Sequence, residues 1–291
     1  MKNIKVLAPA KINLGLEIIK KRDDGYHEVE MIMQSVNLCD KLTININNSG
    51  KLNVRSDKIF NCKPEQNTVY KAAKKFFATA GIKLNGAEVF IDKIIPQQAG
   101  LAGGSADAAA TLWGLNTLFG NVLSDEKLMQ VAAQIGADVP FCLMGGAAYA
   151  VGTGTELKKI SPLFGCHFVI VKPLINISTA SAYALFDNIK SSKTHSLKNL
   201  LNACEIGDLP GVSKNLFNRF EYLIDETEIF DLKNQMQSCG ALGCLMTGSG
   251  SAVYAIFDDE NLAKSCAKKF KNTYDDVFVC TSTANGPSEI I

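Results

Sequence analysis

The sequence predicts an α+β protein with two domains, and three observations support this prediction. The chain has 291 residues, which is more than one domain usually contains. Its first third alternates in the manner of β-strands. From about Leu157 the pattern restarts with the order β-α-ββ-α-β. The predicted domains are therefore residues 1–156 and residues 157–291.

The first predicted domain begins with strands. Residues 4–19 alternate with the two-residue period of a strand. The stretches KLTININ and KLNVRS, on either side of a turn at residues 48–50, are predicted to be short antiparallel partners. A helix is predicted over Asn67–Ala80, because five apolar residues share one of its faces. These residues are Val69, Ala72, Ala73, Phe76 and Phe77.

The strand AEVFIDKII then leads through Pro96 into a glycine-rich loop. Behind this loop a helix is expected, with Ser105 as its cap. The apolar residues at helical spacing are Ala108, Leu112, Leu115 and Phe119. A second helix, capped by Ser124, is expected to end at Gly136.

The second predicted domain starts with a strand at Cys166–Val171. It continues with helices near Ala180–Phe186, Leu197–Ala203 and Val212–Leu223, a strand-turn-strand at 244–257, a helix from Asn261 and the strand VFVCTS. The last ten residues are expected to form a loose tail.

Charge and cysteine usage narrow the class of protein. Lys and Arg number 30 against 29 acidic residues, so no overall field favours nucleic acid or an acidic membrane. The nine cysteines contain no C-x-x-C pair, which indicates reduced thiols rather than disulfides or a zinc site. No apolar run approaches the ~20 residues needed to cross a bilayer, and the N-terminus lacks the apolar run of an export signal. We therefore expect a cytoplasmic protein.

The segment PQQAGLAGGSADAAA, residues 96–110, is a candidate anion site. Gly100, Gly103 and Gly104 precede an alanine-rich helix, and free amides at a helix N-terminus attract anions. The Lys-Ser/Thr that follows the glycines of a P-loop is missing. Tight helix–strand packing explains the glycines equally well. Ser105 is also a candidate ligand for phosphate or Mg²⁺.

Two charged residues in apolar surroundings are candidate partners of this loop. Lys11, in APAKINLGLEI, shares a predicted strand face with Asn13, and its burial without a partner would be costly. The alternative is an edge strand with Lys11 in water. Asp138, in IGADVPFCL, either caps a short helix with Pro140 in its first turn or acts in catalysis.

Two further turns are candidates for ligand contacts. TGSGS, at 247–251, is either an ordinary hairpin turn or a second set of amide donors for a phosphate. Tyr26 and His27 follow a turn at 23–25. Together they indicate a site where a base stacks, although a single histidine is also common in a purely structural role.

The order of these motifs resembles the GHMP kinase superfamily over essentially the whole chain. The matching stretches are PAKINL, GLAGGSADAA, GADVPF and TGSGS, and RDDGYH at 22–27 is the most specific one. Many relatives carry small residues where this chain has Gln97, Gln98 and Ala99. We expect little effect on phosphate binding, because backbone amides bind the phosphate there. The resemblance implies an N-terminal ATP-binding domain with a left-handed β-α-β unit, against the usual hand. It also implies a ferredoxin-like C-terminal domain, with the active site between the two.

The resemblance also implies residue roles. ATP, with Mg²⁺, would phosphorylate a hydroxyl of a cytidylyl diphosphate sugar alcohol. Lys11 would supply the missing cation, and Asp138 would orient the hydroxyl and accept its proton. The implied ATP contacts are Pro96, Gln97, Gln98, Ala99, Gly100, Leu101, Ala102, Gly103, Gly104, Ser105 and Ala106, with Asn67 and Lys93 at the adenosine end. The implied substrate contacts are Asn13, Tyr26, His27, Thr179 and Tyr183.

No dedicated protein metal site, nucleic acid or membrane partner is implied, and the expected state is a monomer or weak homodimer.

Three alternatives remain open. Another GHMP kinase, acting on homoserine or mevalonate, fits the Gly-Tyr-His stretch less well. An inactive relative that only senses a nucleotide or a sugar is disfavoured by the intact Lys11, Asp138 and glycine-rich loop. A nucleic-acid binder is disfavoured by the neutral charge balance.

Overall fold

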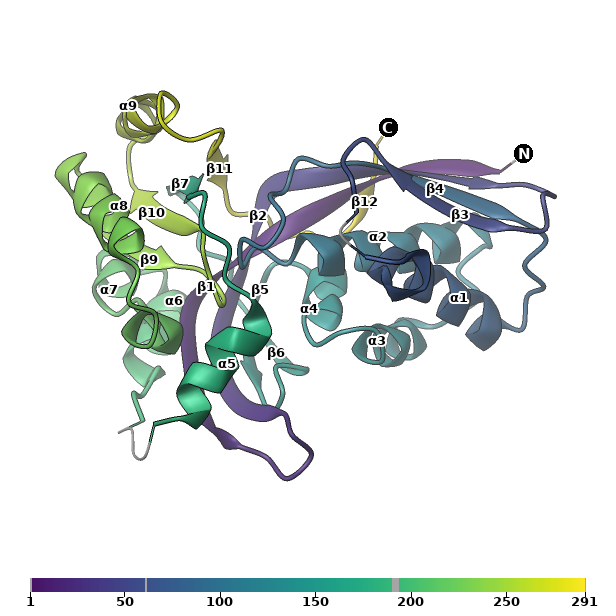
Figure 1. The fold of residues 1–291 in the computed structure, drawn as a ribbon, viewed down its shortest axis with the longest axis horizontal. Helices are drawn as coiled ribbons and strands as arrows, with labels where there is room; N and C mark the ends of the chain where they lie inside the picture. Colours follow the sequence, from purple (N-terminus) through teal and green to yellow (C-terminus); the bar gives the residue numbers. More distant parts are fainter. Residues whose placement is uncertain (1, 61, 190–193, 291) are drawn as a thin grey trace.

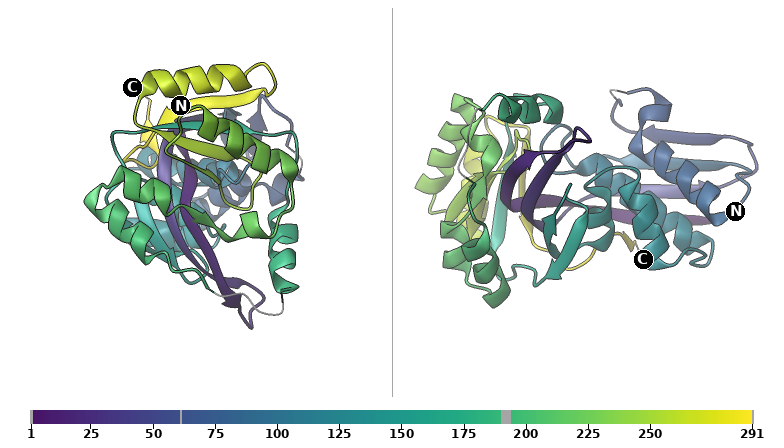
Figure 2. Two further views of the ribbon diagram at one scale, coloured as in Figure 1. Left: turned by 90° about the vertical axis from the view of Figure 1, so that its left-hand side faces the viewer. Right: turned by 90° about the horizontal axis from the view of Figure 1, so that it is seen from below.

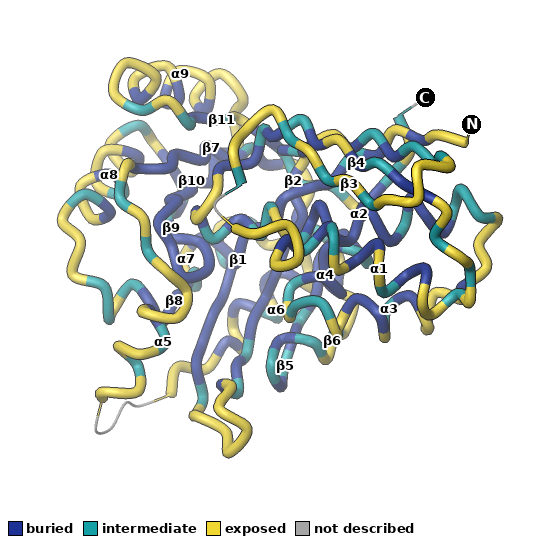
Figure 3. Tube along the Cα trace, turned by 45° about the vertical axis from the view of Figure 1, so that its right-hand side comes forward, coloured by how far each residue is buried: buried dark blue, intermediate teal, exposed yellow. Residues whose placement is uncertain are grey.

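The computed structural model describes residues 2–60, 62–189 and 194–290, and it confirms the predicted α+β class (Figure 1). The first lobe contains β1 (Asn3–Lys21), β2 (His27–Ile46), β3 (Leu52–Ser56), η1 (Pro64–Gln66), α1 (Thr68–Ala80), β4 (Ala87–Asp92), α2 (Gly103–Leu118), α3 (Asp125–Ala133), α4 (Val139–Met144), β5 (Ala147–Val151) and β6 (Glu156–Ile160). The long hairpin β1–β2 extends from this lobe into the second one, and most of its residues are buried, apart from the exposed tip (Figure 3).

The second lobe is a four-stranded antiparallel sheet with helices around it (Figure 2). Its elements are β7 (His167–Lys172), α5 (Thr179–Asp187), α6 (Lys198–Ile206), α7 (Leu209–Lys214), η2 (Arg219–Tyr222), α8 (Thr227–Ser238), β9 (Gly243–Met246), β10 (Val253–Phe257), α9 (Glu260–Phe270) and β11 (Asp276–Thr281). The short strands β8 (Phe217–Asn218) and β12 (Ser288–Glu289) come from the same part of the chain but pair with β1. The strand order β11-β7-β10-β9 and the β-α-ββ-α-β connection are those of a ferredoxin-like domain, which confirms the prediction. Helix α8 was not predicted, although Ile229, Leu232 and Met236 repeat at helical spacing and are buried.

The pairing predicted around the turn at 48–50 is wrong. Strand β4 lies between β2 and β3, antiparallel to the former and parallel to the latter. The turn crosses the end of β4, because Asn47 N donates to Gly86 O at 3.0 Å and Gly50 N to Asn85 O at 2.6 Å. The chain therefore enters β3 parallel to β4, and β3–α1–β4 forms a β-α-β unit. The left hand expected for this unit stays a prediction.

The predicted helix over 67–80 is confirmed, and the side chain of Asn67 caps it by accepting from Val69 N at 2.8 Å. All five residues of its predicted apolar face are buried. Ser124 caps α3 as expected. Ser105, however, does not cap α2. The helix begins at Gly103, after Ala102 has turned the chain with a φ of 58°, so Ser105 lies inside the first turn.

The helix predicted over 212–223 is also wrong. Helix α7 ends at Lys214, and the chain then pairs with β1 through β8. Buried polar contacts explain the break. The amide of Asn218 donates to Met246 O at 2.7 Å and to Gly248 O at 2.8 Å. The guanidinium of Arg219 donates to both oxygens of buried Glu17, at 2.7 and 2.6 Å.

The chain end is paired, contrary to the predicted loose tail. Strand β12 runs antiparallel to β1 beside Val6 and Leu7, and Ile290 N donates to Lys5 O at 2.9 Å. The edge of β1 that β2 leaves open provides these backbone partners. The boundary near residue 156 stays a prediction, because β8 and β12 join the sheet of the first lobe. Among the described residues, no helix has the length and apolar character to span a bilayer.

Candidate active site

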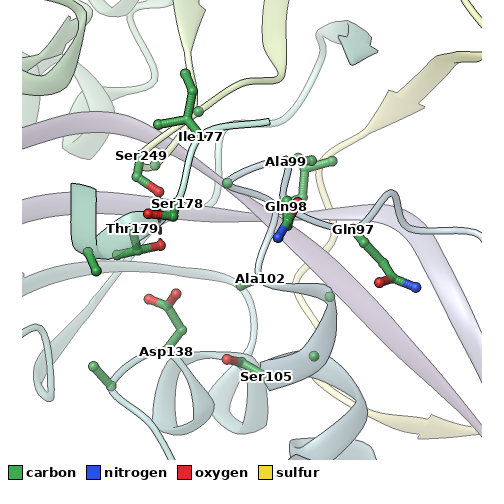
Figure 4. Close-up of a pocket in the computed structure, with 18 of the residues that line it drawn as sticks. Gln97, Gln98, Ala99, Ala102, Ser105, Asp138, Ile177, Ser178, Thr179 and Ser249 are labelled. Atoms are coloured by element: carbon green, nitrogen blue, oxygen red, sulfur yellow. Dashed lines mark hydrogen bonds between the residues drawn. The ribbon is translucent and has the colours of Figure 1, made fainter. Parts of the chain in front are cut away.

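A pocket of about 1090 Å³ lies where the two lobes meet (Figure 4). Its walls come from the glycine-rich loop, the start of α4, β1, α5, the tip of the β1–β2 hairpin and the turn at 248–250. All the residues predicted for the site line this pocket except Asn13 and Ala106, which are buried. Segments from both halves of the chain therefore meet at one site.

The glycine-rich loop is held from behind by the turn TGSGS. Gly100 has a φ of 73°, and a Cβ there would lie 2.0 Å from the carbonyl oxygen of Thr247. Ala252 N donates to Ala99 O at 3.2 Å, and the Thr247 hydroxyl donates to Gly100 O at 3.3 Å. The two backbones touch, so glycine is required at position 100. The amides of Gly103 and Gly104, at the start of α2, donate to no described residue.

Lys11 is buried beside this loop, which excludes the alternative of an edge strand with the lysine in water. Its backbone pairs with β2 on one side, and its N–H donates to Leu101 O at 3.1 Å on the other. The ammonium donates to Asn13 Oδ1 at 2.6 Å. The backbone hydrogen bond to Leu101 therefore fixes the lysine against the glycine-rich loop, although the two are distant in sequence.

Asp138 occupies the N-cap position of α4, but its side chain does not cap the helix. Its carboxylate has no hydrogen-bond partner among the described residues, and Figure 4 shows it directed into the pocket toward Thr179. Burial raises the pKa of the Cys142 thiol on α4, and of the charges that act on it Asp138 raises and Lys11 lowers that pKa. Both charges are therefore close enough to α4 to act on the same buried thiol.

Lys93 and Asn67 line the end of the pocket beside α1. The ammonium of Lys93 is buried beneath the loop, at 2.5 Å from Asp40 Oδ2 and 2.8 Å from Asp107 Oδ2. A Cβ on Gly103 would lie 3.3 Å from it. Neither acidic residue was predicted for the site, although Asp40 ends an apolar strand pattern and Asp107 stands among the alanines that follow the loop.

Stability should fall as the pH rises because of this cluster. Burial raises the pKa of Asp107 from 3.8 to about 8, even though Lys93 lowers it. The folded protein therefore retains a proton that the unfolded chain releases between these values, so the free energy of unfolding decreases across that window. Melting experiments at about pH 5 and about pH 8 measure this decrease. Between the two pH values, Asp107→Asn should lose less stability than the wild type loses. Equal losses in both proteins would contradict this prediction.

At the opposite end of the pocket, four predicted substrate residues come together. Tyr26 is 66% exposed at the hairpin tip, whereas His27 is buried. The ring of Tyr183 stacks on His27 with centroids 4.4 Å apart. The hydroxyl of Thr179 lies 3.0 Å from that of Ser249. Tyr183 was expected to form an aromatic sandwich around a base, and that role stays a prediction.

Hard oxygen donors suit Mg²⁺, and the pocket offers them. The hydroxyl of Ser105 lines it and has no hydrogen-bond partner among the described residues, and neither has the Asp138 carboxylate. In the part of the chain that the structure describes, no group of three or more His, Cys, Asp or Glu side chains could hold a metal ion. The two oxygens fit a divalent ion that enters with a phosphate ligand.

Two family models match the chain: "GHMP kinases N terminal domain" over residues 67–146 and "GHMP kinases C terminal" over residues 196–276. A 4-diphosphocytidyl-2-C-methyl-D-erythritol kinase of Clostridium novyi (strain NT) is 40% identical over 274 residues, which cover 94% of this chain and 97% of that protein. The protein of the same name from Alkaliphilus oremlandii (strain OhILAs) is 40% identical over 293 residues and is covered completely, as is this chain.

Solved structures extend the likeness to the fold. A 4-(cytidine 5'-diphospho)-2C-methyl-D-erythritol kinase has a TM-score of 0.76 and 29% identity, over 96% of this chain and 99% of that one. The homoserine kinase from Cytophaga hutchinsonii has the same TM-score of 0.76 at 21% identity, over 100% and 98%. The backbone therefore resembles both enzymes equally, whereas the sequence is more similar to the first.

Proposed function

We infer the roles of the pocket residues from one premise: the chain belongs to the GHMP kinase family, among its 4-diphosphocytidyl-2-C-methyl-D-erythritol kinases. The enzyme transfers a phosphoryl group from ATP to the 2-hydroxyl of 4-diphosphocytidyl-2-C-methyl-D-erythritol, which gives the 2-phosphate and ADP. This step belongs to the non-mevalonate route to isoprenoid precursors. The 40% identity to the Alkaliphilus oremlandii enzyme across the whole chain supports this choice of substrate.

The phosphates of ATP bind along residues 100–105. The amides of Gly103 and Gly104, which donate to none of the described residues, support this assignment because they lie at the positive end of α2, beside the pocket. The Ser105 hydroxyl would hold the Mg²⁺ that enters with ATP, and the ion would neutralise phosphate charge there. The adenosine end extends toward Asn67 and Lys93. Because the ammonium of Lys93 is already held by Asp40 and Asp107, its part is to support the loop.

Asp138 and Lys11 act on the transfer itself. The Asp138 carboxylate orients the acceptor hydroxyl and takes its proton, and its freedom from hydrogen bonds within the described residues supports this role. The Lys11 ammonium stabilises the negative charge of the phosphoryl group in transit. Asn13 holds Lys11 in place, which makes its own role indirect. Thr179, directly opposite Asp138 in Figure 4, contacts the sugar alcohol.

Tyr26→Ala should weaken binding of the cytidylyl substrate. Tyr26 is exposed beside the pocket, so it can stack on cytosine without rearranging the core. Loss of one base–aromatic stack costs about 1–3 kcal/mol, which appears as a raised KM for this substrate, while kcat and the KM for ATP change little. Tyr26→Phe retains the ring and serves as the control. A KM in Tyr26→Ala equal to that of the wild type would remove Tyr26 from the substrate site.

The decisive experiment offers ATP with each of three alcohols: 4-diphosphocytidyl-2-C-methyl-D-erythritol, homoserine and mevalonate. Release of ADP and the mass of the phosphorylated product are measured in parallel. Turnover of the cytidylyl alcohol alone is expected. Preference for homoserine or mevalonate would overturn the function proposed here. If none of the three alcohols leads to ADP release, the protein is an inactive relative.

Three further expectations stay predictions. These are a monomer or weak homodimer, a cytoplasmic location and the domain division at residues 156 and 157. Sedimentation of the purified protein across a concentration series measures the first of them directly.

A further inference from the structure

Helix α5 is joined to the β1–β2 hairpin at the substrate end of the pocket by one carboxylate. Asp187, the last residue of α5, places Oδ1 2.8 Å from His27 Nε2. Its other oxygen, Oδ2, accepts from Lys21 Nζ at 2.5 Å. His27 begins β2 and Lys21 ends β1, so both partners of Asp187 belong to the hairpin.

The imidazole of His27 is confined on its other sides. Its side chain is 7% exposed, and the ring of Tyr183 stacks on it at an interplanar angle of 22°. Phe186 meets it edge-on, with centroids 5.8 Å apart. These rings fix the plane of the imidazole, and the bond to Asp187 fixes its rotation. His27, Tyr183 and Asp187 all line the pocket.

This geometry selects one tautomer of His27. A carboxylate can only accept hydrogen bonds, so the proton between His27 and Asp187 belongs to Nε2. In a neutral imidazole the other nitrogen, Nδ1, is then an acceptor. Nδ1 has no hydrogen-bond partner among the described residues. The hydrogen bonds from Lys21 and from His27 lower the pKa of Asp187, which keeps this carboxylate charged.

We propose that Asp187 is a positioning residue that holds His27 as the Nε2–H tautomer, so that Nδ1 accepts from the amino group of cytosine and rejects uracil. Cytosine carries an exocyclic amino donor where uracil carries a carbonyl acceptor. An acceptor on the enzyme therefore accepts a hydrogen bond from cytosine. With uracil, the same acceptor faces the carbonyl oxygen, which is also an acceptor and cannot pair with it. This inference rests on the proposed function, because it assumes a cytidylyl substrate.

The first test compares cytidylyl and uridylyl forms of the substrate. The ratio of their kcat/KM values is measured for the wild type, Asp187→Asn and Asp187→Glu. An amide can donate as well as accept, so Asp187→Asn no longer selects a tautomer, and the ratio should fall by about 10-fold, as expected for one hydrogen bond. The change should lie in the KM of the cytidylyl substrate, with kcat and the KM for ATP unchanged. Asp187→Glu restores a carboxylate and should recover part of the ratio.

Glu260→Gln is the matched control. Glu260 is an exposed acid on α9 that accepts from Lys264 at 2.8 Å and does not line the pocket. Its substitution removes an ion pair and one charge, as Asp187→Asn does, and should leave the discrimination ratio unchanged. A ratio in Asp187→Asn equal to that of the wild type, while the wild type phosphorylates the cytidylyl substrate, would overturn the inference and leave the proposed function intact.

The second test reads the tautomer without any substrate. The chain contains three histidines, so ¹⁵N-histidine labelling gives few signals, and His27→Gln assigns those of residue 27. The wild type should show a protonated Nε2 and an unprotonated Nδ1, and Asp187→Asn a mixture of both tautomers. A protonated Nδ1 in the wild type, or identical spectra in the two proteins, would overturn the inference. A wild type that fails to phosphorylate the cytidylyl substrate would overturn the proposed function and, with it, the assignment to cytosine.

Discussion

Asp138→Ala is expected to lower kcat by roughly 10²–10⁴-fold and to leave the melting temperature close to that of the wild type. The side chain makes no hydrogen bond among the described residues, so its removal breaks no structural contact. The loss therefore falls on the transfer step, for which the hydroxyl must be oriented and deprotonated. Steady-state ADP release measures kcat, and thermal melting measures stability.

A matched control for this prediction is Asp208→Ala. Asp208 also occupies the N-cap position of a six-residue helix with a proline near its start, but its side chain does cap the helix, by accepting from Gly211 N at 3.1 Å. Loss of such a cap costs about 1 kcal/mol, so this variant should melt at a lower temperature and retain kcat. An Asp138→Ala enzyme within a few-fold of wild-type kcat would exclude Asp138 from the chemistry.

Local patterns were sufficient to predict the elements whose partners lie close in sequence. The helix over 67–80 was found because its cap Asn67 and its apolar face are set within a single segment. The β-α-ββ-α-β order of the second lobe was found because most of its strands and helices carry their own period, whereas its ferredoxin-like identity came from the resemblance to the family. The position of Lys11 beside the glycine-rich loop came from the order of the motifs, and the bond from Lys11 N to Leu101 O explains it.

The wrong predictions for the helix over 212–223 and for the chain end concern contacts between segments far apart in sequence. The helix expected over 212–223 is broken by the pairing of Arg219 with Glu17, two residues 202 positions apart. The loose tail became β12 because an open edge of β1 lay beside it. Asp187 was missed for the same reason, since nothing near it in the sequence indicates that His27, 160 positions earlier, is its partner. Local propensity cannot report such partners.

Lys11→Met should lower kcat by roughly 10²–10⁴-fold, with a smaller change in the KM for ATP. Lys11 is 4% exposed, and its ammonium donates only to the neutral Asn13 among the described residues, so its charge is available to the phosphoryl group. The transfer builds up negative charge near the loop against which Lys11 is fixed. Methionine retains most of the side-chain volume while removing the charge, so a loss of kcat in this variant reports the charge itself.

Lys11→Ala separates charge from packing, because it also leaves a space beside Asn13. If both variants lose kcat equally, the ammonium acts in the transfer, whereas activity retained by Lys11→Met and lost by Lys11→Ala would reduce Lys11 to a packing role. The double variant Lys11→Met/Asp138→Ala adds a test of cooperation. Residues that act on one transition state lose far less together than the sum of their separate losses, so the double variant should be about as slow as the slower single one. Fully additive losses would mean that the ammonium and the carboxylate act independently of each other.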